Sequence, residues 1–145
     1  MQSAQRAHEA VGAYQEAGCG TSIVNGASGY DTSNGCGSAG AVYVYVRVDG
    51  EWAAQAYIKA ANAGSYDEFG WSVALSGDTL AVGAYGDASC ATGVSTTAAT
   101  DDGCSGAGAV SLYSFNGTAW SFIAYIKAPN AGAGDQFGSS VALSG

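Results

Sequence analysis

The chain has 145 residues, of which 48% are hydrophobic and only 11% are charged, and its formal net charge is −8. Disordered chains show the opposite balance, low hydrophobicity with high charge, so this composition indicates a folded protein. Four basic residues in an acidic chain form no basic stripe, which argues against a nucleic-acid partner. Abundant Gly, Val, Tyr and Thr with a single Pro are typical of an all-β chain with many tight turns.

Residues 1–9 differ in character from the rest of the chain. They contain no apolar core, so they do not read as a secretion signal, and we expect a flexible or short helical lead there. On this interpretation a signal has been removed, or the chain is a fragment of a longer protein. No apolar run reaches the roughly 18 residues of a membrane-spanning helix, so we expect no insertion into a membrane.

From residue 10 onward the pattern predicts eight strands, most of them rich in β-branched and aromatic residues. Three short turns, Asp49-Gly50, Gly77-Asp78 and Asn116-Gly117, are expected to join neighbouring strands as hairpins. The expected strands are 10–14, 41–48, 51–59, 69–76, 79–84, 107–115, 119–127 and 137–144. The expected loops are 18–39, 62–68, 87–106 and 130–136.

Two of these loops carry one cysteine near each end. Cys19 and Cys36 bracket the first long loop, and Cys90 and Cys104 bracket the second. This placement predicts two local disulfides, Cys19–Cys36 and Cys90–Cys104, and an oxidising compartment. A metal site is the alternative, but the chain has no C-x-x-C pair and its one histidine, His8, lies outside the loops.

The strands belong to two copies of one unit. Residues 56–77 return as residues 124–145, and seventeen of the 22 positions are identical. Flanking strands repeat at the same or nearly the same spacing. A duplication this close identifies a repeat protein. The predicted organisation is a lead in residues 1–9, a first repeat in 10–77 and a second repeat in 78–145.

The unit carries a recognisable motif. The string Phe69-Gly70-x-Ser72-Val73 is followed by Val82-Gly83-Ala84 and, after a loop, by Gly108-Ala109-Val110. This motif resembles the FG-GAP repeat of integrin α-like β-propellers, most closely the bacterial extracellular versions, and the resemblance covers residues 10–145. It implies an all-β propeller of four-stranded antiparallel blades, read along the chain as strands 2-3-4, then 1-2-3-4, then 1. It also implies an extracellular, non-enzymatic module for adhesion or ligand binding.

The sequence departs from the family pattern at two places. Tyr14 and Tyr85 stand where the family often has proline. The connection Ser76-Gly77-Asp78 is too short for the Asp-rich calcium loop that integrin-like blades often carry there. Calcium is therefore not implied at that turn.

Two blades cannot close a ring, because propellers have about four to eight. The first strand, 10–14, and the last, 137–144, would each be left with an unpaired edge, and such edges associate readily. Either the chain is part of a longer propeller or copies join head to tail into a ring or a filament. We favour a homo-oligomer assembled through the terminal strands.

Recurrent aromatic residues are candidates for the core. Phe69, Phe137, Trp52 and Trp120 occupy equivalent positions in the two repeats, and we expect them to pack between blades. Stacking platforms for sugars are the alternative interpretation.

Ligand candidates come from what differs between the repeats and from the loop carboxylates. Trp71 and Tyr66 are not repeated, which favours a ligand role or simple surface variation. Asp67 and Asp135 precede Phe-Gly in both repeats; they could bind a ligand, but a carboxylate that caps loop N–H groups is the favoured role.

A weak calcium pattern lies in the first long loop. Asp31, Ser33 and Asn34 alternate in a way that faintly resembles calcium-binding loops, so calcium is the one cofactor to consider. No nucleophile–base set or pair of catalytic carboxylates can be assembled, and we predict a non-enzyme. The expected function is binding or adhesion to a glycan or protein, with a lectin-like propeller and a structural filament subunit as alternatives.

Overall fold

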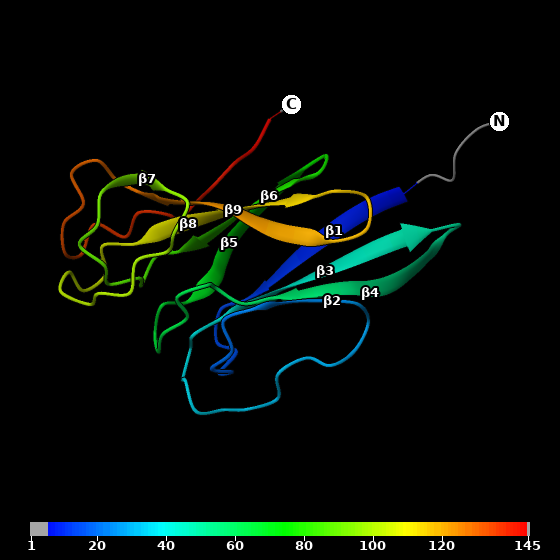
Figure 1. Ribbon diagram of the computed structural model, residues 1–145, viewed down its shortest axis with the longest axis horizontal. Coiled ribbons are helices and arrows are strands. Elements are labelled where there is room, and N and C mark those ends of the chain that lie inside the picture. Colours follow the sequence, from blue (N-terminus) through cyan, green and yellow to red (C-terminus); the bar gives the residue numbers. More distant parts are fainter. Residues whose placement is uncertain (1–5, 145) are drawn as a thin grey trace.

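The computed structural model describes residues 6–144, which form two antiparallel β-sheets that do not close into a barrel or ring (Figure 1). No helix occurs among the described residues, and so none that could cross a membrane. The strands are β1 (Arg6–Ala13), β2 (Ile23–Asn25), β3 (Ala41–Val48), β4 (Glu51–Ile58), β5 (Phe69–Ser76), β6 (Thr79–Ala84), β7 (Gly93–Ser95), β8 (Ala109–Phe115) and β9 (Trp120–Lys127).

Sheet A is built from the first repeat, whereas sheet B joins β5, the last strand of the first repeat, to the strands of the second, so that the longer strands follow the predicted order. Sheet A runs β1-β3-β4-β2, and sheet B runs β5-β6-β8-β9-β7. The predicted hairpin turn between β3 and β4 is confirmed, since Asp49 and Gly50 have positive φ values of 53° and 85°, as a type I′ turn requires. The β3–β4 pair and the β8–β9 pair each carry a β-bulge at the same place in the repeat, after Val44 and after Leu112.

The long loops are not wholly irregular, contrary to prediction. Each contributes a three-residue strand, β2 or β7, to the outer edge of its sheet, where it pairs with β4 or β9. The short stretches Ile23–Asn25 and Gly93–Ser95 contain β-branched residues that suit a strand. They cover edges that would otherwise expose unpaired backbone groups.

The lead was also predicted incorrectly over residues 6–9. These residues are part of β1, because β3 extends far enough to pair with them: Ala7 lies opposite Arg47, and His8 opposite Val46. A ladder partner has therefore overridden a locally helix-like composition. Residues 1–5 lie outside the described part of the chain.

The last predicted strand, 137–144, does not form. Its start is held like the start of β5: Phe137 N–H donates to Ala107 O at 3.0 Å, as Phe69 N–H donates to Ala39 O at 3.1 Å. Beyond one bridge between Phe137 and Gly108 the segment is irregular, and Figure 1 shows it leaving the sheet as a coil. β5 has β6 as its ladder partner, whereas residues 137–144 have no equivalent strand beside them in the part of the chain that the structure describes.

The main core lies between the two sheets. Sheet A contributes Val42, Val44 and Ile58, and sheet B contributes Phe69 and Trp120, together with the smaller residues around them. The prediction that four recurrent aromatics pack between blades is therefore only half right.

Trp52 and Phe137 are the two exceptions. Trp52 is 50% exposed and Phe137 is only half-buried. Sheet A covers Trp120, while Trp52 projects from the face of sheet A that points away from sheet B. Phe137 stands at the start of the unformed strand.

Candidate functional site

Each long loop is closed by the predicted disulfide. Cys19 pairs with Cys36 and Cys90 with Cys104, with Cα–Cα separations of 5.2 and 5.1 Å. The metal alternative for these cysteines is therefore wrong. By the chain-entropy model each bridge contributes roughly 3 kcal/mol, so the loops are anchored platforms on one end of each sheet.

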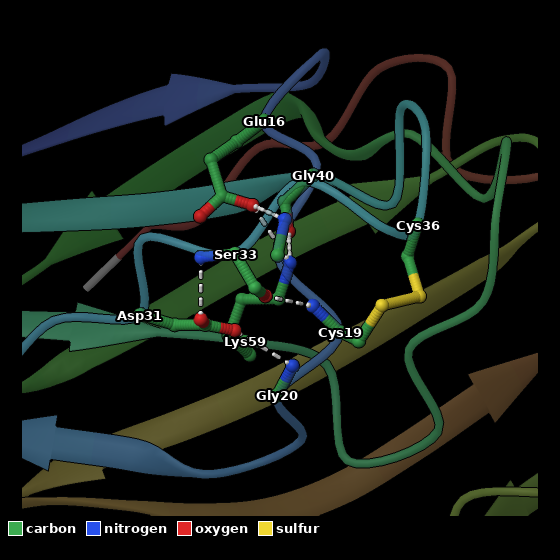
Figure 2. Close-up of a disulfide and its surroundings, with 9 residues drawn as sticks. Glu16, Cys19, Gly20, Asp31, Ser33, Cys36, Gly40 and Lys59 are labelled. Atoms are coloured by element: carbon green, nitrogen blue, oxygen red, sulfur yellow. Dashed lines mark hydrogen bonds and ion pairs between the residues drawn. A yellow bond between two sulfur atoms is a disulfide. The ribbon is translucent and has the colours of Figure 1, made fainter.

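A buried ion pair lies behind the first disulfide (Figure 2). Lys59 Nζ is 3.0 Å from Glu16 Oε1, with side-chain exposures of 1% and 15%. Lys59 also donates to Gly40 O at 2.7 Å, and Tyr57 O–H donates to Glu16. Burial and the bond to Glu16 raise the pKa of Tyr57 well above its usual range. A buried charge is tolerated only when it is paired and hydrogen-bonded, so this set fixes the base of the loop.

The second repeat builds a similar arrangement with different partners, but Lys127 Nζ makes no hydrogen bond within the described chain. Lys127 Nζ lies 3.5 Å from Asp87 Oδ1, and Tyr125 O–H lies 3.1 Å from both oxygens of Asp87. Asn62, from the loop of the first repeat, donates to Asp87 Oδ2 at 3.0 Å. Asp87 therefore ties the two repeats together.

Sequence reasoning missed these two clusters. The signal was present, because two of the four basic residues recur at equivalent positions, at Lys59 and Lys127. Their partners were harder to find. Glu16 and Asp87 align only if the two repeats are compared at the slightly longer spacing of the strands that precede them, and one is a glutamate where the other is an aspartate.

The calcium candidates serve the first loop itself. The Asp31 carboxylate accepts hydrogen bonds from Gly20 N–H at 3.0 Å and Ser33 N–H at 2.8 Å, and Ser33 Oγ accepts from Cys19 N–H. These bonds, first that of Ser33, lower the pKa of Asp31. Asn34 is exposed. Among residues 6–144 no group of three or more His, Cys, Asp or Glu side chains is arranged to hold a metal ion.

An aromatic cluster joins the two repeats at the surface. Trp71 of β5 lies between Tyr14 and Tyr85, with ring centroids 4.6 Å from each. Trp71 is 43% exposed and Tyr14 36%. A hydrogen bond with Glu68 is the main cause that raises the pKa of Tyr85, so a carboxylate borders the rings. We call Tyr14, Trp71 and Tyr85 the aromatic cluster.

Tyr66 and Asp67 lie in a separate, open pocket of about 470 Å³ between the loops of the two repeats. Asp67 is buried there and Tyr66 is 70% exposed. Burial first, and then the charges of Asp87 and Asp102, raise the pKa of Asp67 to about 7. The pocket is lined by Gly64, Ser65, Tyr66, Asp67, Gly86, Ala88, Asp102, Ser105 and Gly106.

Asp135, the counterpart of Asp67, is exposed and joins no pocket of this kind in the described chain. Its carboxylate accepts a hydrogen bond from Gly132 N–H at 2.9 Å, the loop-capping contact favoured from sequence. The structure therefore brings Tyr66 and Asp67 together, places Trp71 in the aromatic cluster, and leaves Asp135 apart.

Comparison with known proteins identifies part of the chain. The sequence model of the FG-GAP repeat matches residues 52–113, which run from β4 through β5 and β6 to β8. Neither a search of curated proteins nor a search of solved structures found a significant match.

Proposed function

The chain carries an FG-GAP repeat in residues 52–113, and from this premise we propose that it is an extracellular, non-enzymatic binding and adhesion module whose two sheets are blades of a β-propeller. FG-GAP repeats are generally non-enzymatic and suggest such a module. Two disulfides support an oxidising compartment outside the cytosol. The repetition of one sheet design, with inter-sheet packing along one face, supports the blade interpretation.

Copies of the module join head to tail through their terminal strands in this proposal. One observation carries it: among residues 6–144, β1 has no partner on its outer edge, whereas the equivalent strand β6 pairs there with β5. Residues 137–144 repeat the β5 sequence with a single change, Trp71 to Ser139. The segment 137–144 of one copy then pairs with β1 of the next.

The register of this pairing between copies follows from the register of β5 against β6 within one copy. Val73 lies opposite Val82, and Ala74 opposite Ala81. The equivalent contacts between copies place Val141 opposite Val11 and Ala142 opposite Ala10. A pairing of this kind is heterologous, so it closes into a ring or continues as a filament.

The native mass of the oxidised protein, measured by light scattering, tests the assembly. A discrete species of about three or four copies supports a closed ring of six or eight blades, and large heterogeneous species support the filament alternative. Ala142→Pro should return the mass to that of a monomer, because proline cannot join the ladder. Ala142→Ser is the matched control and should assemble normally. A wild-type monomer at all concentrations would overturn this part of the proposal.

A lectin-like role is the second candidate, and the aromatic cluster favours it. Trp71, Tyr14 and Tyr85 offer partly exposed rings beside the Glu68 carboxylate. Aromatic faces can pack on the C–H face of a sugar ring, while a phenol can donate to or accept from its hydroxyls and a carboxylate accepts from them.

A glycan array tests this second role. Trp71→Ser, which installs the residue that the second repeat has at this position, should abolish binding. Tyr66→Ser is the control, since Tyr66 is an exposed ring outside the cluster. Absence of binding by the wild-type protein at high concentration would count against a lectin.

A further inference from the structure

The contact between the two sheets provides a template for how copies could pack. Trp120 is 2% exposed because sheet A covers it. Its indole N–H donates to Gln55 Oε1 at 2.8 Å, and its backbone N–H donates to Asn25 Oδ1 at 2.8 Å. The His8 ring lies edge-on to the indole at 5.6 Å. One face of sheet A is therefore shaped to receive the tryptophan of sheet B.

The opposite face of sheet A is covered at one end, where Tyr30 of the first loop stacks on Tyr57, and is open at the end that carries Trp52. Partners across a ladder share a face, and Trp52 pairs with Arg47 while Val11 pairs with Tyr43, so these four side chains lie on the face away from sheet B. Trp52 is 50% exposed and Val11 46%, although their equivalents in sheet B, Trp120 and Val82, are 2% and 0% exposed. We call Val11, Tyr43, Arg47 and Trp52 the Trp52 face.

The complementary surface lies on the far side of sheet B. The residue equivalent to Gln55 is Ile123, at the same bulge, and it is 43% exposed. Val94 pairs with Ile126 just as Ile23 pairs with Ile58 in sheet A. Ile58 is fully buried between the sheets, whereas its equivalent Ile126 is only half-buried. Ile23 is half-buried, whereas its equivalent Val94 is 73% exposed. We call Val94, Ile123 and Ile126 the Ile123 face.

We propose that the Trp52 face of one copy packs on the Ile123 face of a second copy, in the arrangement that sheet B already has on sheet A. This inference rests on the proposed head-to-tail assembly and names the side chains that hold it. Ile123 replaces Gln55 at the receiving position, so the Trp52 indole packs on an apolar side chain instead of donating a hydrogen bond. Such an aromatic anchor in an apolar surface is the usual centre of an interface.

Charge at the border of the two faces supports a second copy as the occupant. Arg47 takes the position that Phe115 has in sheet B, and Phe115 contacts His8 at a ring distance of 5.0 Å. The residue equivalent to His8 is Thr79, the neighbour of Asp78 in the turn before β6. In the packed assembly Arg47 of one copy therefore lies next to the Asp78 turn of the other copy. Arg47 is one of four basic residues in a chain of net charge −8, so this contact brings opposite charges together.

Two single variants, Trp52→Glu and Ile123→Glu, test the inference by sedimentation velocity on the oxidised protein. Both side chains are about half exposed in the single chain, so each variant should keep the fold while self-association weakens at least about tenfold. Tyr66→Glu, a charge placed on an exposed ring outside both faces, is the control and should associate like the wild type.

Mixing the two variants gives the sharpest result. The Trp52→Glu copy keeps an intact Ile123 face, and the Ile123→Glu copy keeps an intact Trp52 face, so the mixture has one good junction and should stop at a heterodimer. Assembly that Ala142→Pro abolishes but Trp52→Glu and Ile123→Glu leave unchanged would overturn this inference and keep the strand pairing. A wild-type monomer at all concentrations would overturn both.

Discussion

Residues 69–76 and 137–144 differ at one position of eight, yet the first segment is strand β5 and the second is irregular after its first bridge. Both begin with the same backbone hydrogen bond to the preceding sheet. The difference is the neighbour: β6 lies beside β5, and no strand lies beside 137–144 in the described chain. Strand formation here depends on an available ladder partner more than on local propensity.

The burial of equivalent side chains in the two repeats also depends on whether a neighbouring element is present. Asp67 is covered by the loop of the second repeat, while Asp135 is exposed; Trp120 is covered by sheet A, while Trp52 is exposed. Equivalent residues therefore differ in environment because one has a neighbouring repeat and the other does not. Matched substitutions at equivalent positions measure what that neighbour contributes.

The largest effect is expected at the buried ion pairs. Asp87→Ala should lower the free energy of unfolding by about 5 kcal/mol, the upper end for breaking a buried pair, because Asp87 neutralises Lys127 and also bonds Tyr125 and Asn62. Glu16→Ala should cost about 3 kcal/mol, since Lys59 keeps its bond to Gly40 O. Urea denaturation measures both, and equal losses would contradict the expected difference between the two ion pairs.

The two recurrent tryptophans come next. Trp120→Ala should destabilise the protein by about 3–4 kcal/mol, because it empties a buried site and leaves Gln55 Oε1 without its donor. Trp52→Ala should cost only about 1 kcal/mol in the monomer, because half of the Trp52 surface is already in water. The comparison is made by thermal unfolding at low concentration; a large loss for Trp52→Ala would mean that its exposed face is covered in solution.

The pH dependence of stability should report on Asp67. Its folded-state pKa is raised to about 7 from 3.8, so between these values the folded protein binds more protons than the unfolded chain. Stability should therefore fall as pH rises from about 4 to about 7, by at least about 1 kcal/mol, and level off above that. Asp67→Asn should remove this dependence.

The matched control for that experiment is Asp135→Asn. Because Asp135 is exposed, the variant should follow the wild-type curve of unfolding free energy against pH. A slope that persists in Asp67→Asn would assign the effect to another carboxylate.

The turns, disulfides and strand order could be predicted because each depends on local chemistry or on the repeat. Asp49-Gly50 suits a turn with two positive φ values, and paired cysteines at loop ends leave few connections. Strands β2 and β7 could not be predicted, because three residues carry too little pattern and form only where an open sheet edge lies beside them.

The candidate site was predicted less completely, for a related reason. Trp71 was singled out because it is not repeated, but its contacts come from Tyr14 and Tyr85, one in each repeat, which only the packing of the sheets brings together. Asp31 finds its structural equivalent in Asp101, which accepts from Cys90 N–H as Asp31 accepts from Gly20 N–H. The spacing of the repeat changes inside this loop, so alignment of the two repeats at the fixed offset of residues 56–77 and 124–145 pairs Asp31 with Ala99 instead.

The smallest expected effect lies at the border of the aromatic cluster, where the repeats differ by Glu68 and Gln136. The bond to Glu68 is the largest cause of the raised pKa of Tyr85, because a carboxylate stabilises the protonated phenol that donates to it and repels the phenolate. Glu68→Gln, which installs the residue of the second repeat, should lower the pKa of Tyr85 toward its ordinary value. Ultraviolet titration measures this as the difference between each protein and its Tyr85→Phe partner. An unchanged Tyr85 titration would show that the Glu68 carboxylate does not reach the cluster in solution, and it would weaken the case for a polar group poised beside those rings.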